Sequence, residues 1–234
     1  MITLQTSYNP QGRSEMKFGI SYIDYQHIRM KLKTIMQLDP HAKENGRYHI
    51  RSCYFENFQN KVLTEKKEGF YRRDKYRVRI YDKSDNVIHL ERKSKRNNQT
   101  YKSKCSVTKA EFERIRQHKI EWMQDDERSL IRDLYKDMML YQLRPTTVVD
   151  YEREAYMYRY GNVRITFDSK VQTSHRNNNL FNKNLPMVDV LEPNEVILEV
   201  KYDEYLPTVI KMLLQGVHTR HEAYSKYQLS RMFG

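Results

Sequence analysis

Three consecutive segments decide the fold, namely KYRVRIY at 75–81, VIHLERK at 87–93 and TYKSK at 100–104. Each alternates apolar and polar residues with a period of two, which is typical of β-strands. In the first segment Tyr76, Val78 and Ile80 share one face, and Arg77 and Arg79 share the other. Turn-forming residues at 84–86 and 97–98 separate the segments. The sequence therefore predicts two successive hairpins with one apolar and one cationic face.

Working outward, the rest of the chain mixes strands and helices. Helix starts are predicted where Ser21 is followed by Asp24 and where Thr108 is followed by Glu111, because both pairs resemble capping boxes. We predict a loose leader at 1–12, a charged connection at 56–73 and an Asn-rich loop at 169–194. Further strands are predicted at 13–20, 48–55, 146–156, 162–168 and 195–202, and further helices at 126–143, 209–214 and 225–232. This intermixed order indicates one α+β domain over 1–234.

Composition narrows the class of protein. The 234 residues carry 42 Lys and Arg against 30 Asp and Glu, a net charge of +12, which indicates a polyanionic partner. No apolar run reaches the roughly 20 residues that a membrane helix needs. The N-terminus has no apolar signal core, and Cys53 and Cys105 form neither a metal motif nor a disulfide framework. We therefore expect a cytoplasmic protein.

The polar faces of the predicted strands repeat the cationic pattern. Lys102 and Lys104 align on one strand, while Arg153 and Arg164 lie on later ones. About seven such strands could close into a barrel with a cationic lumen, which becomes favourable when a polyanion occupies it. The alternative is an open sheet with a solvated basic face. Three of the faces also carry a glutamate two residues from a lysine, namely Glu15 with Lys17, Glu91 with Lys93 and Glu199 with Lys201. These glutamates could bind a metal ion beside a phosphate site, or they could simply form ion pairs with the lysines.

At this point the motifs resemble a known family, the VTC domain, which is the polyphosphate-polymerase branch of the triphosphate tunnel, or CYTH-like, enzymes. The resemblance runs from about Arg13 to Tyr227, and its specificity lies in the order and spacing of the motifs. They are RSEMKF (13–18), LDPHAKENGRYHIRSCYFEN (38–57), RRDKYRVRIY (72–81), LERKSK (90–95), VVDYEREAY (148–156), NVRITFD (162–168), ILEVKYDEYLP (197–207) and AYSKY (223–227).

The resemblance implies an antiparallel eight-stranded tunnel with helices packed on its outside, binding ATP and a growing polyphosphate or pyrophosphate chain. It implies a metal-binding Glu199, with Glu15 as a second ligand for Mn²⁺ or Mg²⁺, and catalytic roles for Arg77, Arg79, Lys93 and Lys226. The implied phosphate-binding residues are Lys17, Arg77, Arg79, Lys93, Lys102, Arg153, Arg164, Lys201, Ser225 and Lys226. Lys104 faces the same way as Lys102 and competes with it for that role.

Three functions stay open from the sequence. The first is a polymerase that transfers the γ-phosphate of ATP to polyphosphate, and the second is a module that binds triphosphate or polyphosphate without turnover. The third is a triphosphatase, against which Arg13 argues because many tunnel enzymes carry an acid there. We do not expect nucleic-acid binding, because no such motif appears and Tyr76 lies on the apolar face. The family resemblance also suggests a membrane-protein partner that receives the product.

Overall fold

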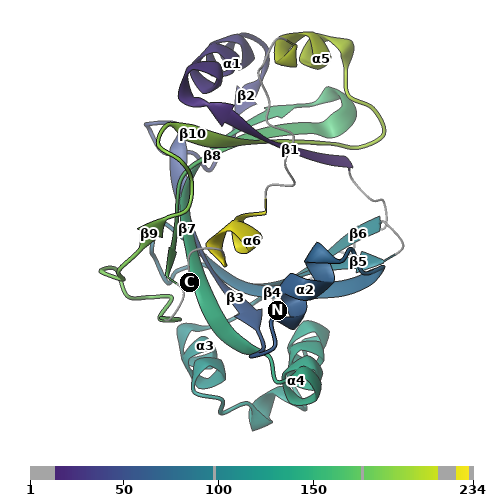
Figure 1. Cartoon of the computed structure of the whole chain (residues 1–234), viewed down its shortest axis with the longest axis vertical. Coiled ribbons are helices and arrows are strands. Elements are labelled where there is room, and N and C mark those ends of the chain that lie inside the picture. Colours follow the sequence, from purple (N-terminus) through teal and green to yellow (C-terminus); the bar gives the residue numbers. More distant parts are fainter. Residues whose placement is uncertain (1–13, 97–98, 175–176, 216–224, 232–234) are drawn as a thin grey trace, which may run out of the picture.

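One antiparallel sheet curves round on itself and forms the body of the protein (Figure 1). The computed structural model describes residues 14–96, 99–174, 177–215 and 225–231. Eight strands follow one another across the sheet in the order β1-β10-β8-β7-β3-β4-β5-β6, and the two-residue strands β2 and β9 pair with β7 and β8. The strands are β1 (Ser14–Ser21), β2 (Gln37–Leu38), β3 (Arg47–Glu56), β4 (Arg72–Tyr81), β5 (Ile88–Arg96), β6 (Gln99–Ser106), β7 (Arg144–Tyr158), β8 (Val163–Ser174), β9 (Val188–Asp189) and β10 (Glu195–Tyr202).

The ring of strands is a loose barrel. In the described part of the chain, β1 and β6 are the two ends of the strand path, and no backbone pairing joins them. A side-chain contact spans this side instead, because Lys93 Nζ on β5 lies 2.9 Å from Glu15 Oε2 on β1. The predicted α+β fold with eight antiparallel strands and external helices is confirmed. It differs from a closed barrel in that β1 and β6 do not pair in the described part of the chain.

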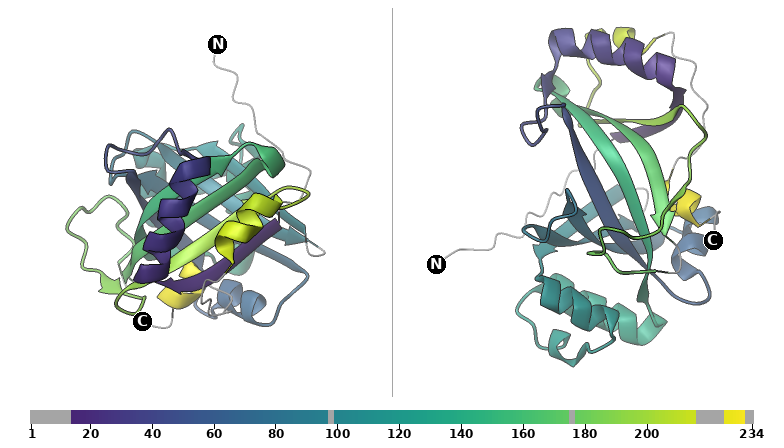
Figure 2. Two further views of the ribbon diagram at one scale, coloured as in Figure 1. Left: turned by 90° about the horizontal axis from the view of Figure 1, so that it is seen from above. Right: turned by 90° about the vertical axis from the view of Figure 1, so that its left-hand side faces the viewer.

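Helices cover two opposite outer sides of the sheet (Figures 1 and 2). On one side α1 (Tyr22–Ile35) and α5 (Thr208–Leu214) lie next to each other, and on the other α3 (Lys109–Arg116) and α4 (Ser129–Tyr141) pack with the short helix η1 (Glu121–Met123). Each pair buries its own apolar core against the strands. Among the described residues, no helix has both the length and the apolar character needed to cross a bilayer.

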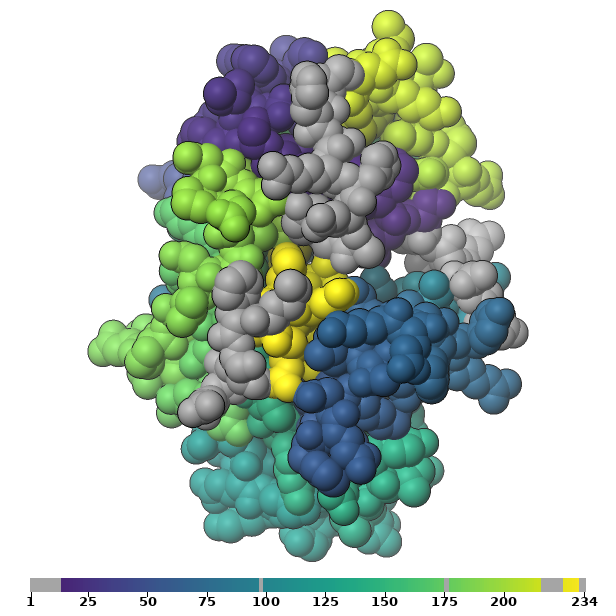
Figure 3. Space-filling model, viewed as in Figure 1, coloured from purple at the N-terminus to yellow at the C-terminus, as the bar shows by residue number. Residues whose placement is uncertain are grey.

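Two short helices are placed differently from the outer four. Helix α6 (Lys226–Ser230) lies inside the curve of the sheet, and α2 (Lys61–Lys67) lies beside it at one mouth of the ring (Figures 1 and 3). A hydrogen bond from Lys66 of α2 to Gln228 of α6 joins them. The remaining short helix, η2 (Tyr160–Asn162), connects β7 to β8.

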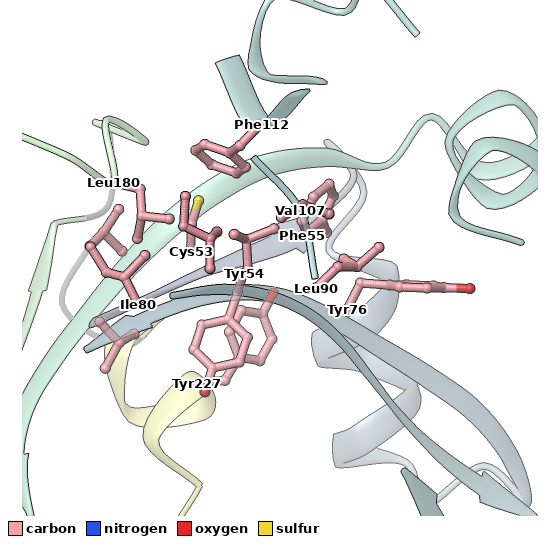
Figure 4. Packing of buried hydrophobic residues seen from close by; sticks show 14 of the residues in the cluster. Cys53, Tyr54, Phe55, Tyr76, Ile80, Leu90, Val107, Phe112, Leu180 and Tyr227 are labelled. Atoms are coloured by element: carbon pink, nitrogen blue, oxygen red, sulfur yellow. The ribbon is translucent and has the colours of Figure 1, made fainter. Parts of the chain in front are cut away.

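The alternation in the sequence decides which side chains face the helices. On β4 the apolar residues Tyr76, Val78 and Ile80 are buried in the core beneath α3 and α4. On β3, Cys53 and Phe55 lie on the side of Phe112 from α3, while Tyr54 lies on the other side of the sheet, next to Tyr227 of α6 (Figure 4). The centroids of these two tyrosine rings are 5.1 Å apart. The opposite, polar faces of the strands therefore turn inward.

Local signals placed the helix starts correctly. The Ser21 side chain accepts a hydrogen bond from the Asp24 amide at 3.0 Å, and Thr108 and Glu111 form a complete capping box. These contacts satisfy amide groups that have no partner within the helix. Both predicted helix starts are confirmed.

Two predicted connections contain regular structure. Helix α2 interrupts the predicted connection at 56–73, because the Glu56 carboxylate accepts hydrogen bonds from the amides of Val62 and Leu63 at its start. The predicted loop at 169–194 is shortened because β8 continues to Ser174 and pairs with β9. Four predictions fall outside the described residues, namely the leader at 1–12, a strand start at Arg13, a turn at 97–98 and a helix end at Met232.

Candidate functional site

The inner face of the sheet carries alternating cations and acids from facing strands. On β4, Arg77 is directly opposite Glu91 of β5, and on β10, Glu199 is directly opposite Lys17 of β1. Each strand contributes every second residue to this face, so charged side chains from seven strands (β1, β4, β5, β6, β7, β8 and β10) and from α6 meet there. The inner face thus collects residues from both ends of the chain.

Glu91 is the centre of one charge cluster. Its Oε2 accepts hydrogen bonds from Arg77 Nε at 2.7 Å, and its Oε1 lies 2.6 Å from Lys102 Nζ. Arg79 lies farther away at 3.9 Å, and its guanidinium donates to Ser52 Oγ and Tyr151 OH. Burial alone would raise the pKa of Glu91, but the charges of Arg77, Arg79 and Lys102 hold it far below its ordinary value. One carboxylate is therefore shared by three cations.

Glu199 is the centre of a second cluster on the facing strands. Lys201 Nζ lies 3.0 Å and Lys17 Nζ 3.6 Å from its Oε1, and Arg153 Nη2 lies 3.5 Å from its Oε2. Although burial favours the protonated acid, these cations, with Lys17 the strongest, lower the pKa of Glu199 well below its ordinary value. Glu199 therefore carries a negative charge at neutral pH.

Asp168 fixes the helix inside the ring to the wall of the sheet. Arg153 binds this fully buried carboxylate in a bidentate manner at 2.6 and 2.7 Å, and Lys226 of α6 forms an ion pair with it. Lys226 Nζ also lies 4.8 Å from the centroid of the Tyr151 ring. These contacts position the start of α6, and with it Lys226, against the second cluster.

Two carboxylates are close enough to serve one cation. Lys17 Nζ lies 2.6 Å from Glu15 Oε1 and 3.6 Å from Glu199 Oε1, so a single positive charge already sits between these acids. Within the described residues no group of three His, Cys, Asp or Glu side chains could hold a metal alone. Mg²⁺ is commonly bound by one or two carboxylates together with substrate phosphates. The residues fit a divalent ion that arrives with its phosphate ligand.

Most of the predicted phosphate-binding residues meet on the inner face, as the contacts above and the strand alternation place them. They are Lys17, Arg77, Arg79, Lys93, Lys102, Arg153, Lys201 and Lys226. Of the two lysines on β6, Lys102 is the one whose ion pair reaches Glu91.

The other two predicted residues have contacts of a different kind. Arg164 lies directly opposite Lys201 in the register of β8 with β10, but its Nη2 donates to Asp39 Oδ2 at 2.6 Å and to Tyr48 OH at 3.0 Å. Ser225 is the N-cap of α6, where its hydroxyl accepts from the Gln228 amide at 3.4 Å. Their roles toward phosphate stay predictions.

Four residues of the inner face were not identified as site residues from the sequence, namely Tyr54, Lys75, Tyr151 and Asp168. Tyr54 and Tyr151 contact the guanidinium groups of Arg77 and Arg79 through their hydroxyls. Lys75 could have been found, because it precedes Arg77 and Arg79 in the same alternation. Asp168 also alternates with Arg164, but its pairing with Arg153 depends on the register of β7 with β8.

Together with Lys75, the residues joined by these inner-face ion pairs comprise nine cations and four carboxylates. The cations are Lys17, Lys75, Arg77, Arg79, Lys93, Lys102, Arg153, Lys201 and Lys226, and the carboxylates are Glu15, Glu91, Asp168 and Glu199. Such an excess in a half-buried space is unfavourable without anions. The arrangement suits a ligand with several phosphate groups.

The curved antiparallel sheet has the triphosphate tunnel, or CYTH-like, fold. A Bacillus halodurans protein assigned as an adenylate cyclase has the same fold, with a TM-score of 0.50 and 13% identity over 82% of this chain and 80% of its own. Hippeastrum HpAC1, described as having a dominant triphosphatase activity, matches with a TM-score of 0.55 and 12% identity over 94% and 96%. A search of the curated proteins gave no match. The family model of the VTC domain matches residues 12–233, so the chain belongs to the VTC domain family.

Proposed function

We propose that this protein is an inorganic polyphosphate polymerase, which transfers the γ-phosphate of ATP to the end of a polyphosphate chain held on the inner face of the barrel. The observation that carries the proposal is the sharing of single carboxylates among several cations. Glu91 neutralises part of the charge of Arg77, Arg79 and Lys102, and Glu199 does so for another set. Phosphate groups would supply the missing negative charge without any rearrangement of the strands.

The reaction needs alignment and charge neutralisation more than acid–base chemistry. An oxygen of the terminal phosphate of the chain forms a bond to the γ-phosphorus, the bond from that phosphorus to the β–γ bridging oxygen breaks, and ADP leaves. The attacking oxygen is already anionic, so no general base is required. Arg77 and Arg79 would bind equatorial oxygens of the transferred group, because guanidinium groups match phosphate oxygens bidentately.

Lys93 and Lys226 would act on the same phosphates from other directions. Lys93 is exposed on β5 and bridges to Glu15, and Lys226 comes from α6. Both form ion pairs that a phosphate oxygen could replace while the lysine stays charged. Glu199 and Glu15 would hold Mg²⁺ or Mn²⁺, which supplies bridging and neutralisation of phosphate oxygens when bound. Lys17, Lys102, Arg153 and Lys201 would complete the cationic surround, and Arg164 and Ser225 would bind phosphate at its edges.

The test is a reaction of the purified protein with ATP, Mn²⁺ and a pyrophosphate primer. ADP release is followed in solution, and the products are separated on a gel stained for polyphosphate. A ladder of long chains with matching ADP is the expected result. Free phosphate without chains, or no product at all despite tight triphosphate binding, would contradict the polymerase.

Those two contrary results correspond to the two other functions. Triphosphatase activity is favoured by the likeness to HpAC1, which shares this fold and is described as having that activity. In that case water replaces the terminal phosphate as acceptor. Binding without turnover uses the same cations, because the residues that hold a triphosphate also stabilise its transfer. A cytoplasmic location and a membrane-protein partner that receives the product remain part of the proposal.

A further inference from the structure

One row of the inner face consists of lysines alone. The strand register places Lys75 of β4 directly opposite Lys93 of β5, and Lys93 directly opposite Lys102 of β6. Like charges directly opposite each other on one face of a sheet are destabilising. The next row along the strands contains Arg77 and Glu91, so it includes an acid, whereas the row of Lys75, Lys93 and Lys102 does not.

Lys75 has an unusual environment for a lysine. Its neighbours in the row reach acids, since Lys93 pairs with Glu15 and Lys102 with Glu91. In the described parts of the chain no carboxylate lies within ion-pair distance of Lys75, whose ammonium group lies 5.0 and 5.4 Å from the ring centroids of Tyr54 and Tyr227. Burial, followed by the charges of Arg77, Lys93 and Lys17, lowers the pKa of Lys75 to about 7. Aromatic rings already surround the ammonium group of Lys75, so the partner that the site still lacks is an acidic group.

A second lysine without an acid approaches the same place from α2. Lys66 donates a hydrogen bond to the side chain of Gln228 on α6, and among the described residues it also has no ion pair. Burial and then the charges of Lys17, Arg73 and Lys93 lower its pKa to about 8. Lys66 contacts Gln228 and Lys75 contacts the ring of Tyr227, and these two partners are neighbouring residues of α6, so both lysines lie against the same helix.

We propose that Lys75 and Lys66 form a second phosphate subsite, which binds the units of a polyphosphate chain that lie beyond the three phosphates held at Arg77 and Arg79. The inference rests on the proposed binding of polyphosphate, but not on turnover. A chain leaving Arg77 along β4 meets Lys75 next, at a step of about 7 Å for two residues of a strand. From there Lys66 leads it out at the mouth of the ring where α2 lies beside α6. The subsite makes the interior selective for long chains over triphosphate.

The experiment compares the affinity of the full chain for tripolyphosphate and for long-chain polyphosphate, with Mg²⁺ and without ATP. The variants are Lys66→Ala, Lys75→Met and the double variant. The matched control is Lys67→Ala, because Lys67 is the exposed neighbour of Lys66 on the same helix. In the double variant we expect long-chain affinity to fall about 10- to 100-fold, the effect of losing charge-assisted contacts. Affinity for tripolyphosphate should change little, and the control should match the wild type for both.

The result that would overturn the subsite is an equal loss for both ligands, or no loss for long chains. Equal affinity of the wild type for the two ligands would overturn it as well. Lys75→Met removes a half-buried charge that pairs with no acid among the described residues, so it should fold. Lys66→Ala gives an independent test if it does not. Because no step of the assay requires ATP, a selective loss in a protein that makes no polyphosphate would support the subsite and contradict the polymerase.

Discussion

The two faces of the sheet use the same residue types for different purposes. On the outer face, Arg51 of β3 binds Asp150 of β7 in a bidentate pair at 2.7 and 2.8 Å and is fully buried. Its remaining donors reach the carbonyl groups of Leu180 and Asn182. On the inner face, Arg77 shares Glu91 with two other cations.

The difference lies in whether charge is balanced within the protein. The outer pair has one acid for one cation, and its polar atoms are bonded to protein groups, so it connects β3, β7 and the segment after β8. A buried pair of this kind is costly to break. The inner clusters keep positive charge in excess, so they can lose one cation and still leave no acid without a partner. Outer charges hold the fold, and inner charges are available to a ligand.

The largest expected effect is on phosphoryl transfer. Arg77→Ala and Arg79→Ala should each lower the rate roughly 10²- to 10³-fold, the range found when one donor to a transition-state charge is removed. Neither should unfold the protein, since Glu91 keeps two cations in each case. The measurement is ADP release with a pyrophosphate primer, alongside a thermal melt.

The matched control for these variants is Arg92→Ala. Arg92 lies on the outer face of β5, where it pairs with Asp133 of α4 at 2.9 Å. It should leave the rate unchanged, because it does not reach the interior. A rate in Arg77→Ala equal to that of the wild type would sink the proposed role of the inner face.

The reverse experiment breaks the outer pair. Asp150→Asn leaves the Arg51 guanidinium buried without its counter-charge, and we expect it to lower the free energy of unfolding by about 3 kcal/mol. Urea denaturation measures this loss. Tripolyphosphate affinity of the folded variant should stay at the wild-type value; a clear drop would mean that the two faces are not independent.

The approximate number of strands and the residues of the inner face could be predicted from the sequence, because both depend on local alternation. In KYRVRIY the period of two separates Tyr76 and Val78 from Arg77 and Arg79 without any knowledge of the partner strands. The starts of α1 and α3 could also be predicted, since a capping box lies within four residues. These features need only short-range information.

The features that could not be predicted depend on contacts between distant residues. Helix α2 lies in a charged segment, and its start is held by Glu56, which also accepts from Tyr227 far along the chain. Likewise, the choice of Lys102 over Lys104 as the partner of Glu91 depends on how the side chains lean across β5 and β6. Alternation places both lysines on one face but does not rank them.

A third prediction uses the ligand to test the excess of inner charge. Tripolyphosphate at about 100 times its Kd should raise the free energy of unfolding by about 2.7 kcal/mol, because it binds only the folded chain. The gain should shrink as salt is added, since exposed parts of these contacts are screened. A thermal shift at low and high salt measures both. Asp150→Asn should show the same gain as the wild type, whereas Arg77→Ala should show less.

The last expected effect is the response of the stability of the ligand-free protein to pH. Lys75 has a pKa of about 7 when folded, for the reasons given above, and about 10.4 in an unfolded chain. Burial would raise the pKa of Tyr54, but Arg77, Lys75 and Arg79 lower it to about 7 as well. Between pH about 7 and about 10, Lys75 and Tyr54 therefore keep protons in the unfolded chain that they have released in the folded chain. Stability should therefore rise as the pH increases above about 7, by at most about 1.4 kcal/mol per pH unit for each proton.

The groups around this pair explain which variants test it. Lys75 faces Tyr54 of β3, Tyr227 of α6, Arg77 of β4, Lys93 of β5 and Lys17 of β1. Lys75→Met removes the titrating ammonium group and Tyr54→Phe the phenol, so each should flatten the rise in stability measured by urea denaturation between pH about 7 and about 8.5. Saturating long-chain polyphosphate should flatten it too, because the added negative charge keeps Lys75 protonated. An identical slope in Lys75→Met would mean that the ammonium group is balanced in the folded protein, and the contrast between the two faces would then not extend to this row.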